Sequence, residues 1–239
     1  MDRTLAIGLA IALVGGLVRG TTGFGAAMIM TPALALLMGA KVAVPVALLL
    51  ETFAAATMLP AAASLARWRV IAPIGAAAIC TVPLGGLLLS GADPGVLRRL
   101  IAITVIVFSA ALLIGRRFRG EHRLGTSIGL GALSGTMLGA TSIGGPPVIL
   151  YLLSGPDAAA VTRANLTLYI VLVSAAGLVM LAVAGLLDAF ALRTAAALTV
   201  PFVAGVIAGS KLFSRFSDQR FRQLTIVFMF VVSLGVLFA

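Results

Sequence analysis

The sequence is poor in charge, in cysteine and in histidine. Of its 239 residues 10% are charged and 61% are hydrophobic, and the mean hydropathy is +1.19. Soluble domains carry about a quarter charged residues, and a soluble chain of this size could not bury so much apolar surface. The composition therefore excludes a soluble globular protein and a disordered one, and it predicts a polytopic membrane protein.

The scarcity of reactive side chains excludes further classes. The single cysteine, Cys80, rules out a disulfide scaffold and is expected to be a buried packing residue. No cluster has metal-ligand spacing, no G-x-x-x-x-G-K-[ST] run offers a phosphate loop, and no G-x-S-x-G elbow is present. We therefore expect no metal, no cofactor and no enzymatic activity. The net charge of +10 comes from basic residues in short gaps between apolar runs, where they act as topology signals rather than as a nucleic-acid surface.

Apolar runs of membrane-spanning length occupy most of the chain. Charged residues divide it into eight units, at 4–40, 42–66, 70–92, 100–115, 124–156, 164–187, 194–210 and 223–239. The first and fifth units are unusually long and are interrupted by glycine. Setting Gly39 against Gly155 repeats the order of units with a shift of 155 − 39 = 116 residues. The sequence thus predicts two transmembrane repeats, 1–118 and 119–239, with no soluble domain.

The basic residues distinguish two topologies. If all eight units cross the membrane, each side carries eight basic residues, and no positive-inside bias results. If the first and fifth units are re-entrant hairpins, one side carries five and the other eleven, with Arg19 inside the membrane unit. The hairpin model is favoured over eight plain spans. It predicts an all-α fold of two inverted repeats, each a glycine-broken unit plus three transmembrane helices, with both termini outside.

Two glycine clusters at matching positions of the halves are candidates for a binding site. Interrupted hydrophobic segments of this kind are the best sequence pointer to a transporter site. Helix ends created by the breaks would direct free N–H groups, and the positive end of the helix dipole, toward an anion. Close packing of helices through small residues is the alternative. The candidate residues are Thr21, Thr22, Gly23, Phe24 and Gly25 in the first cluster, and Thr141, Ser142, Gly144, Gly145 and Pro146 in the second.

Arg19 is the most informative single residue, because it is an ionisable group inside an apolar unit. Its guanidinium fork suits an oxyanion. The alternatives are snorkelling to the surface and a structural ion pair with Glu51, the one acid inside an apolar unit. Both roles can coexist if Glu51 holds Arg19 when no substrate is bound. Glu51 could instead carry a coupling proton.

The start of the sixth unit supplies three further candidates. Asn165 and Tyr169 are four residues apart, on one face of a helix, and could line a polar cavity. Arg163 is either part of that site or a cytoplasmic anchor, and the two are weighed equally. Trp68, between two arginines, is expected to be an interfacial anchor.

The order of these motifs resembles a known family. Arg-Gly-Thr-Thr-Gly-Phe-Gly at 19–25, Pro32 and Leu-Leu-Glu at 49–51 resemble the first half of TauE/SafE-type exporters of sulfite and organosulfonates, the 4-toluene sulfonate uptake permease family. Gly139 followed by Gly-Gly-Pro-Pro at 144–147, and then Arg163-Ala164, resemble the second half. The resemblance covers nearly the whole chain. It implies site positions at Arg19, Thr22, Gly23, Gly25, Gly144, Gly145, Pro146 and Arg163.

The resemblance implies a secondary transporter of small anions in the bacterial inner membrane. Family members export sulfite, sulfoacetate and related sulfur compounds. Pro146 stands where the commoner form has a third glycine, which leaves the pocket size and the substrate open. A carboxylate transporter and a non-transporting membrane scaffold are the alternatives. The expected partners are a small sulfur anion and the lipid bilayer, with no nucleic acid, and a homodimer stays open.

Overall fold

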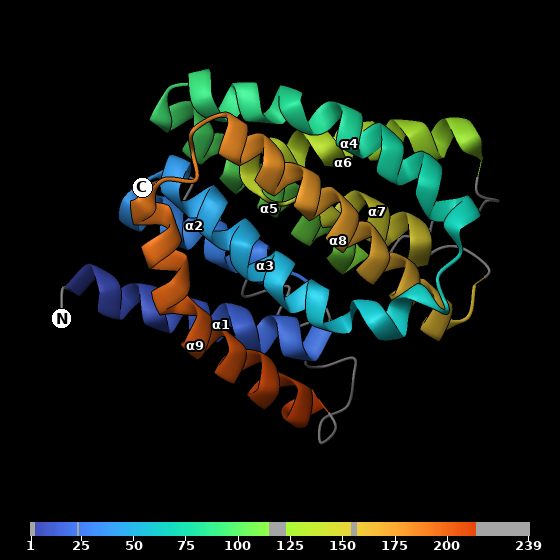
Figure 1. Ribbon diagram of the computed structural model, residues 1–239, viewed down its shortest axis with the longest axis horizontal. Helices are drawn as coiled ribbons and strands as arrows, with labels where there is room; N and C mark the ends of the chain where they lie inside the picture. The colour runs from blue at the N-terminus through green and yellow to red at the C-terminus, as the bar shows by residue number, and fades with distance from the viewer. Residues whose placement is uncertain (1–2, 23, 115–122, 154–156, 214–239) are drawn as a thin grey trace.

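The computed structural model describes residues 3–22, 24–114, 123–153 and 157–213, and every regular element within these ranges is an α-helix (Figure 1). The expectation of an all-α chain is confirmed for this part. The helices are α1 (Arg3–Thr22), α2 (Ala26–Met38), α3 (Ala40–Ala63), α4 (Trp68–Gly91), α5 (Pro94–Ile114), α6 (Leu124–Thr141), α7 (Gly145–Leu153), α8 (Ala159–Val183) and α9 (Ala189–Phe213).

Six of these helices, α1, α3, α4, α5, α8 and α9, are long and apolar enough to cross a membrane. Single helices form five of the six expected plain spans, and the sixth, 223–239, lies outside the described residues. The two long units are each broken into a pair of helices, α1 with α2 and α6 with α7. One difference from a simple re-entrant unit is that α1, with 20 residues, has the length of a full span.

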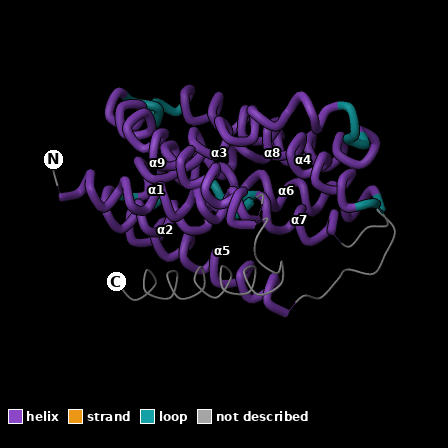
Figure 2. The backbone as a smooth tube through the Cα atoms, turned by 90° about the horizontal axis from the view of Figure 1, so that it is seen from below, coloured by secondary structure: helices purple, strands orange, loops and turns teal. Residues whose placement is uncertain are grey.

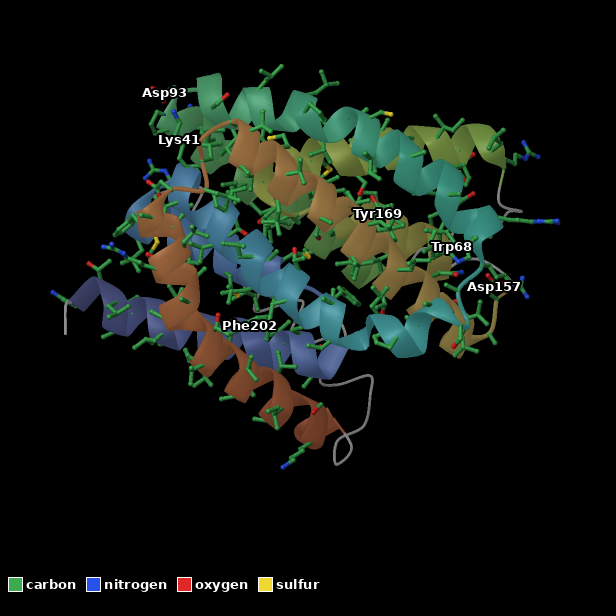
Figure 3. The ribbon with its side chains drawn as sticks, in the orientation of Figure 1. Lys41, Trp68, Asp93, Asp157, Tyr169 and Phe202 are labelled. Carbon is green, nitrogen blue, oxygen red and sulfur yellow. The ribbon has the colours of Figure 1, made fainter. Side chains whose placement is uncertain are left out.

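The second helix of each broken unit is too short to cross the bilayer. The 13 residues of α2 extend about 20 Å and the 9 residues of α7 about 14 Å, against a hydrocarbon core of about 30 Å. Lys41, just after α2, and Asp157, just after α7, lie at opposite ends of the molecule (Figure 3). The two short helices therefore lead from the interior to opposite ends.

Two helix pairs that join the halves are packed through glycines (Figures 1 and 2). At four glycines of α1 and α9, an added methyl group would overlap backbone of the other helix, and the same holds for four glycines of α4 and α6. Small residues at such crossings let membrane helices approach closely. These contact glycines are Gly16, Gly20, Gly205 and Gly209 in the first pair, and Gly85, Gly131, Gly135 and Gly139 in the second.

Large apolar side chains also cover the outside of the bundle. Leu87, Val183 and Val200 are 70%, 86% and 75% exposed, which in water would be costly and in lipid is not. Trp68 is 52% exposed at the first residue of α4, as an interfacial anchor requires. The expectation for Cys80 was wrong: its side chain is exposed on α4, because the buried side of that helix is the glycine-bearing side.

Candidate functional site

The two helix breaks meet inside the bundle. Gly25, before α2, has φ +88°, and Ser142, after α6, has φ +59°, so both breaks pass through the left-handed region. The Thr31 and Ser142 hydroxyl oxygens are 2.7 Å apart in a buried hydrogen bond. These residues are 111 positions apart in the chain, so the bond fastens the first broken unit to the second.

A buried ion pair lies at the first break. The Arg19 Nη1 atom of α1 is 2.9 Å from Glu51 Oε2 of α3, and the two residues are 4% and 7% exposed. The Ala27 backbone N–H, in the first turn of α2, donates to Glu51 Oε1 at 3.0 Å. One carboxylate thus binds the two positive groups at this break, which are the Arg19 guanidinium and the N-terminus of α2 with its partial positive charge.

A small cavity lies between the two breaks, and the space open to the centre of a water-sized sphere is about 50 Å³. That is room for a few waters, and so for a site that holds one very small ligand. Its wall is mostly apolar, with polar side chains at a few points, which is the usual composition of such a site. Six helices and the two breaks contribute to the lining, which comprises Arg19, Phe24, Gly25, Ala27, Met28, Leu48, Glu51, Leu138, Ser142, Ile143, Gly145, Pro146, Ile149, Tyr169, Ile170 and Ser174.

Hydroxyl groups hold the second break. The Ser134 hydroxyl of α6 donates to the Gly144 carbonyl and is 2.5 Å from the Tyr169 hydroxyl of α8. The Thr141 hydroxyl donates to the Met137 carbonyl at 2.7 Å and accepts from the Ile143 N–H at 3.2 Å. The Tyr169 hydroxyl therefore braces the break, while the residue also contributes to the cavity wall.

The structure brings eight of the fifteen predicted positions to the cavity: Arg19, Phe24, Gly25, Glu51, Ser142, Gly145, Pro146 and Tyr169. Three others lie beside it without lining it. The hydroxyls of Thr21 and Thr141 donate to carbonyls of their own helices. The Gly144 carbonyl accepts a hydrogen bond from the Ser134 hydroxyl. Gly23 and the side chains of Thr22 and Arg163 lie outside what the structure describes.

The four-residue spacing suggested that Asn165 and Tyr169 both line a cavity. Tyr169 lines it and Asn165 does not. Asn165 lies one turn nearer the end of α8, where its Oδ1 atom accepts from the Arg67 N–H at 2.7 Å. The Arg67 guanidinium pairs with Asp157, which also accepts from Asn165 Nδ2 at 3.5 Å. Asn165 thus belongs to a polar clamp between the halves at one end of the molecule.

Several cavity and bracing residues were not predicted. The apolar wall residues Met28, Leu48 and Ile149 look like any other membrane-helix side chain in the sequence. Thr31 and Ser134 lie mid-helix, away from the glycine clusters. The available signal was a hydroxyl in the apolar run beside each break, after the first break for Thr31 and before the second for Ser134. In the described part of the chain no group of three or more His, Cys, Asp or Glu side chains is placed to hold a metal ion.

Comparison with known proteins identifies a family for the chain. A family model described as sulfite exporter TauE/SafE matches residues 8–236, nearly the whole chain. No curated protein and no solved structure matches the chain.

Proposed function

The chain belongs to the sulfite exporter TauE/SafE family of membrane transporters, and on that premise we propose that it exports sulfite or a small organosulfonate across the bacterial inner membrane. The observation that carries the proposal is the buried Arg19 guanidinium in the wall of a cavity between two broken helices. Burying an arginine at this depth is costly, so the residue is a functional-site candidate by default, and its fork fits the oxygens of a sulfur oxyanion.

The electrostatics of the cavity favour an anion. Arg19 and Glu51 cancel in formal charge, and the N-terminus of α2 then adds roughly half a positive charge. The N-terminus of α7 points a second helix start at the same space through Gly145. An anion therefore meets a net positive site inside an otherwise apolar wall.

The proposed architecture is a pair of inverted repeats, 1–118 and 119–239. If α1 corresponds to α6 and α4 to α9, the glycine pair α1–α9 maps onto the glycine pair α6–α4. The short helices α2 and α7 then correspond as well, and they lead to opposite ends. A site between two such repeats can be exposed to each side in turn by rocking one against the other.

The membrane potential supplies a direction. An interior-negative potential favours the exit of an unaccompanied anion by about 2.3 kcal/mol per charge for each 100 mV. Export of such an anion needs no ATP-hydrolysing domain, in keeping with the absence of a phosphate-loop motif from the sequence.

Flux from proteoliposomes tests the proposal. Vesicles loaded with sulfite, sulfoacetate, thiosulfate, sulfate or acetate are compared for wild type, Arg19→Ala and Arg193→Ala, at equal amounts of monodisperse protein. Arg193 is exposed on α9 and serves as the matched control. We expect efflux of a sulfur anion that Arg19→Ala abolishes and Arg193→Ala preserves. Efflux of acetate alone would indicate a carboxylate transporter, and no efflux of any anion would favour a scaffold.

A further inference from the structure

Glu51 poses a problem for an anion site, because it puts a carboxylate where the substrate should bind. Its two oxygens hold the Arg19 guanidinium and the Ala27 N–H at 2.9 and 3.0 Å. These are the donors that a sulfur oxyanion in the cavity would use. In the empty site, the Glu51 carboxylate thus occupies the donors that the substrate anion would otherwise bind.

Two anions cannot share these donors. If the substrate takes the guanidinium and the helix terminus, Glu51 loses both partners while remaining 7% exposed and next to a new negative charge. An unpaired buried carboxylate beside an anion is costly, and neutralisation by a proton is the usual outcome.

Few other groups can supply or compensate that charge. Arg19 from α1 and Tyr169 from α8 are the remaining titratable side chains in the cavity lining, while α2, α6 and α7 contribute none there. On the other helices packed against α3, the described charged side chains are near the helix ends: Arg69 on α4, Arg98 and Arg99 on α5, and Arg193 and Lys211 on α9. The Cys80 thiol, in the middle of α4, is exposed on the outside of the bundle. The Tyr169 hydroxyl is bonded to Ser134.

We propose that the substrate anion displaces the Glu51 carboxylate from Arg19 and from the start of α2, and that Glu51 takes up one proton as it does so. The proton comes from solvent and bonds to a carboxylate oxygen. When the anion leaves, Glu51 gives up the proton and pairs with Arg19 again. The loaded protein thus carries an anion and a proton, and the empty protein carries neither.

This inference rests on the proposed function and changes its energetics. A proton that accompanies a monoanion cancels its charge, so the membrane potential no longer drives the movement. The concentration gradient of the anion and the pH gradient together set its direction instead. Linkage also requires the apparent anion affinity to fall about tenfold per pH unit where binding takes up a full proton.

The test uses methanesulfonate, a monoanion at every working pH, in proteoliposomes that contain a pH-sensitive dye. Wild type, Glu51→Gln and the control Asp93→Asn, an exposed acid at the end of the molecule, are compared with and without an imposed potential. For wild type and the control we expect one proton to leave per anion and no effect of potential. Glu51→Gln keeps an oxygen for Ala27, so we expect anion efflux without protons and with a dependence on potential.

The outcomes separate the two proposals. Wild-type efflux that follows the potential and moves no protons overturns the coupling and leaves the anion transporter standing. An unchanged proton count in Glu51→Gln overturns the role of Glu51. No efflux of any sulfur anion by wild type overturns both. Should Glu51→Gln not fold, calorimetric titration of detergent-solubilised wild type in buffers of different ionisation enthalpy measures the protons bound per anion, and a value of zero contradicts the coupling.

Discussion

The two helix breaks are built on the same plan but stabilised by different chemistry. At the first, a carboxylate joins a guanidinium and the start of a helix. At the second, the neutral hydroxyls of Ser134 and Thr141 bond to the backbone around the break, and the Tyr169 hydroxyl bonds to Ser134. The start of α7 also has two prolines, Pro146 and Pro147, which lack N–H groups, so its first turn has fewer donors for an anion than that of α2.

The difference indicates a division of roles. On the proposed function, we infer that the first break provides the charges that select an anion and that the second provides a neutral wall. The proposed repeat would then preserve the position of each break and not its side-chain chemistry. Four predictions test this comparison, in order of the size of the expected effect.

The first prediction concerns the ion pair. Arg19→Met leaves Glu51 buried without its guanidinium, and we expect a loss of about 3–5 kcal/mol in the free energy of unfolding. The double variant Arg19→Met with Glu51→Gln removes both charges and keeps an acceptor for Ala27, so it should regain most of that stability. Unfolding by SDS in mixed micelles measures both.

The double variant should nevertheless transport no anion, because charge at the first break serves transport rather than folding. A double variant that stays as unstable as the single one would show that the pair is needed for folding itself. The division of roles would then fail at the first break.

The second prediction concerns the hydroxyl network. Ser134→Ala leaves the Gly144 carbonyl and the Tyr169 hydroxyl without this partner, and we expect a loss of about 1–3 kcal/mol. The matched control is Ser109→Ala on α5. Ser109 is fully buried, and within the described part of the chain its hydroxyl has no hydrogen-bond partner. Its replacement should leave stability unchanged or raise it, again by SDS unfolding. Equal losses of unfolding free energy in Ser134→Ala and Ser109→Ala would show that the hydrogen bonds of Ser134 do not stabilise the second break.

The third prediction concerns the backbone of the first break. Gly25→Ala places a side chain at φ +88°, and we expect a loss of about 1–2 kcal/mol, as for other non-glycine residues in the left-handed region. Thermal unfolding in detergent measures it. Gly75 in α4, with open space around the position of a side chain and a helical backbone, is the control, and Gly75→Ala should be neutral or stabilising.

Much of the fold follows from the sequence because its determinants are local. Hydropathy and charge placed the plain spans, and the glycine clusters marked both breaks. Arg19 and Glu51 were recognised because ionisable groups are rare in apolar units, and the ion pair between them, which was one of the alternatives for Arg19, is present.

Long-range packing could not be obtained in the same way. The bond between Thr31 and Ser142 joins residues 111 positions apart, and nothing in the local spacing encodes it. The four-residue spacing of Asn165 and Tyr169 did place them on one face of α8, but a full helical turn separates them along the axis. One therefore reaches the cavity and the other the end of the molecule.

The last prediction returns to the second break, where a serine takes the left-handed conformation that glycine takes at the first. Ser142→Gly loses the bond to Thr31, worth about 0.5–1.5 kcal/mol, and gains about 1–2 kcal/mol from the relief of strain, so the two effects nearly cancel. Ser142→Ala loses the bond and keeps the strain, so it should be the less stable variant by thermal unfolding in detergent. If both variants lose the same stability, the backbone at Ser142 carries no strain and the bond to Thr31 is the whole effect. If Ser142→Gly keeps the wild-type stability and Ser142→Ala does not, the serine at this position accepts backbone strain and gains a hydrogen bond that joins the second break to the first.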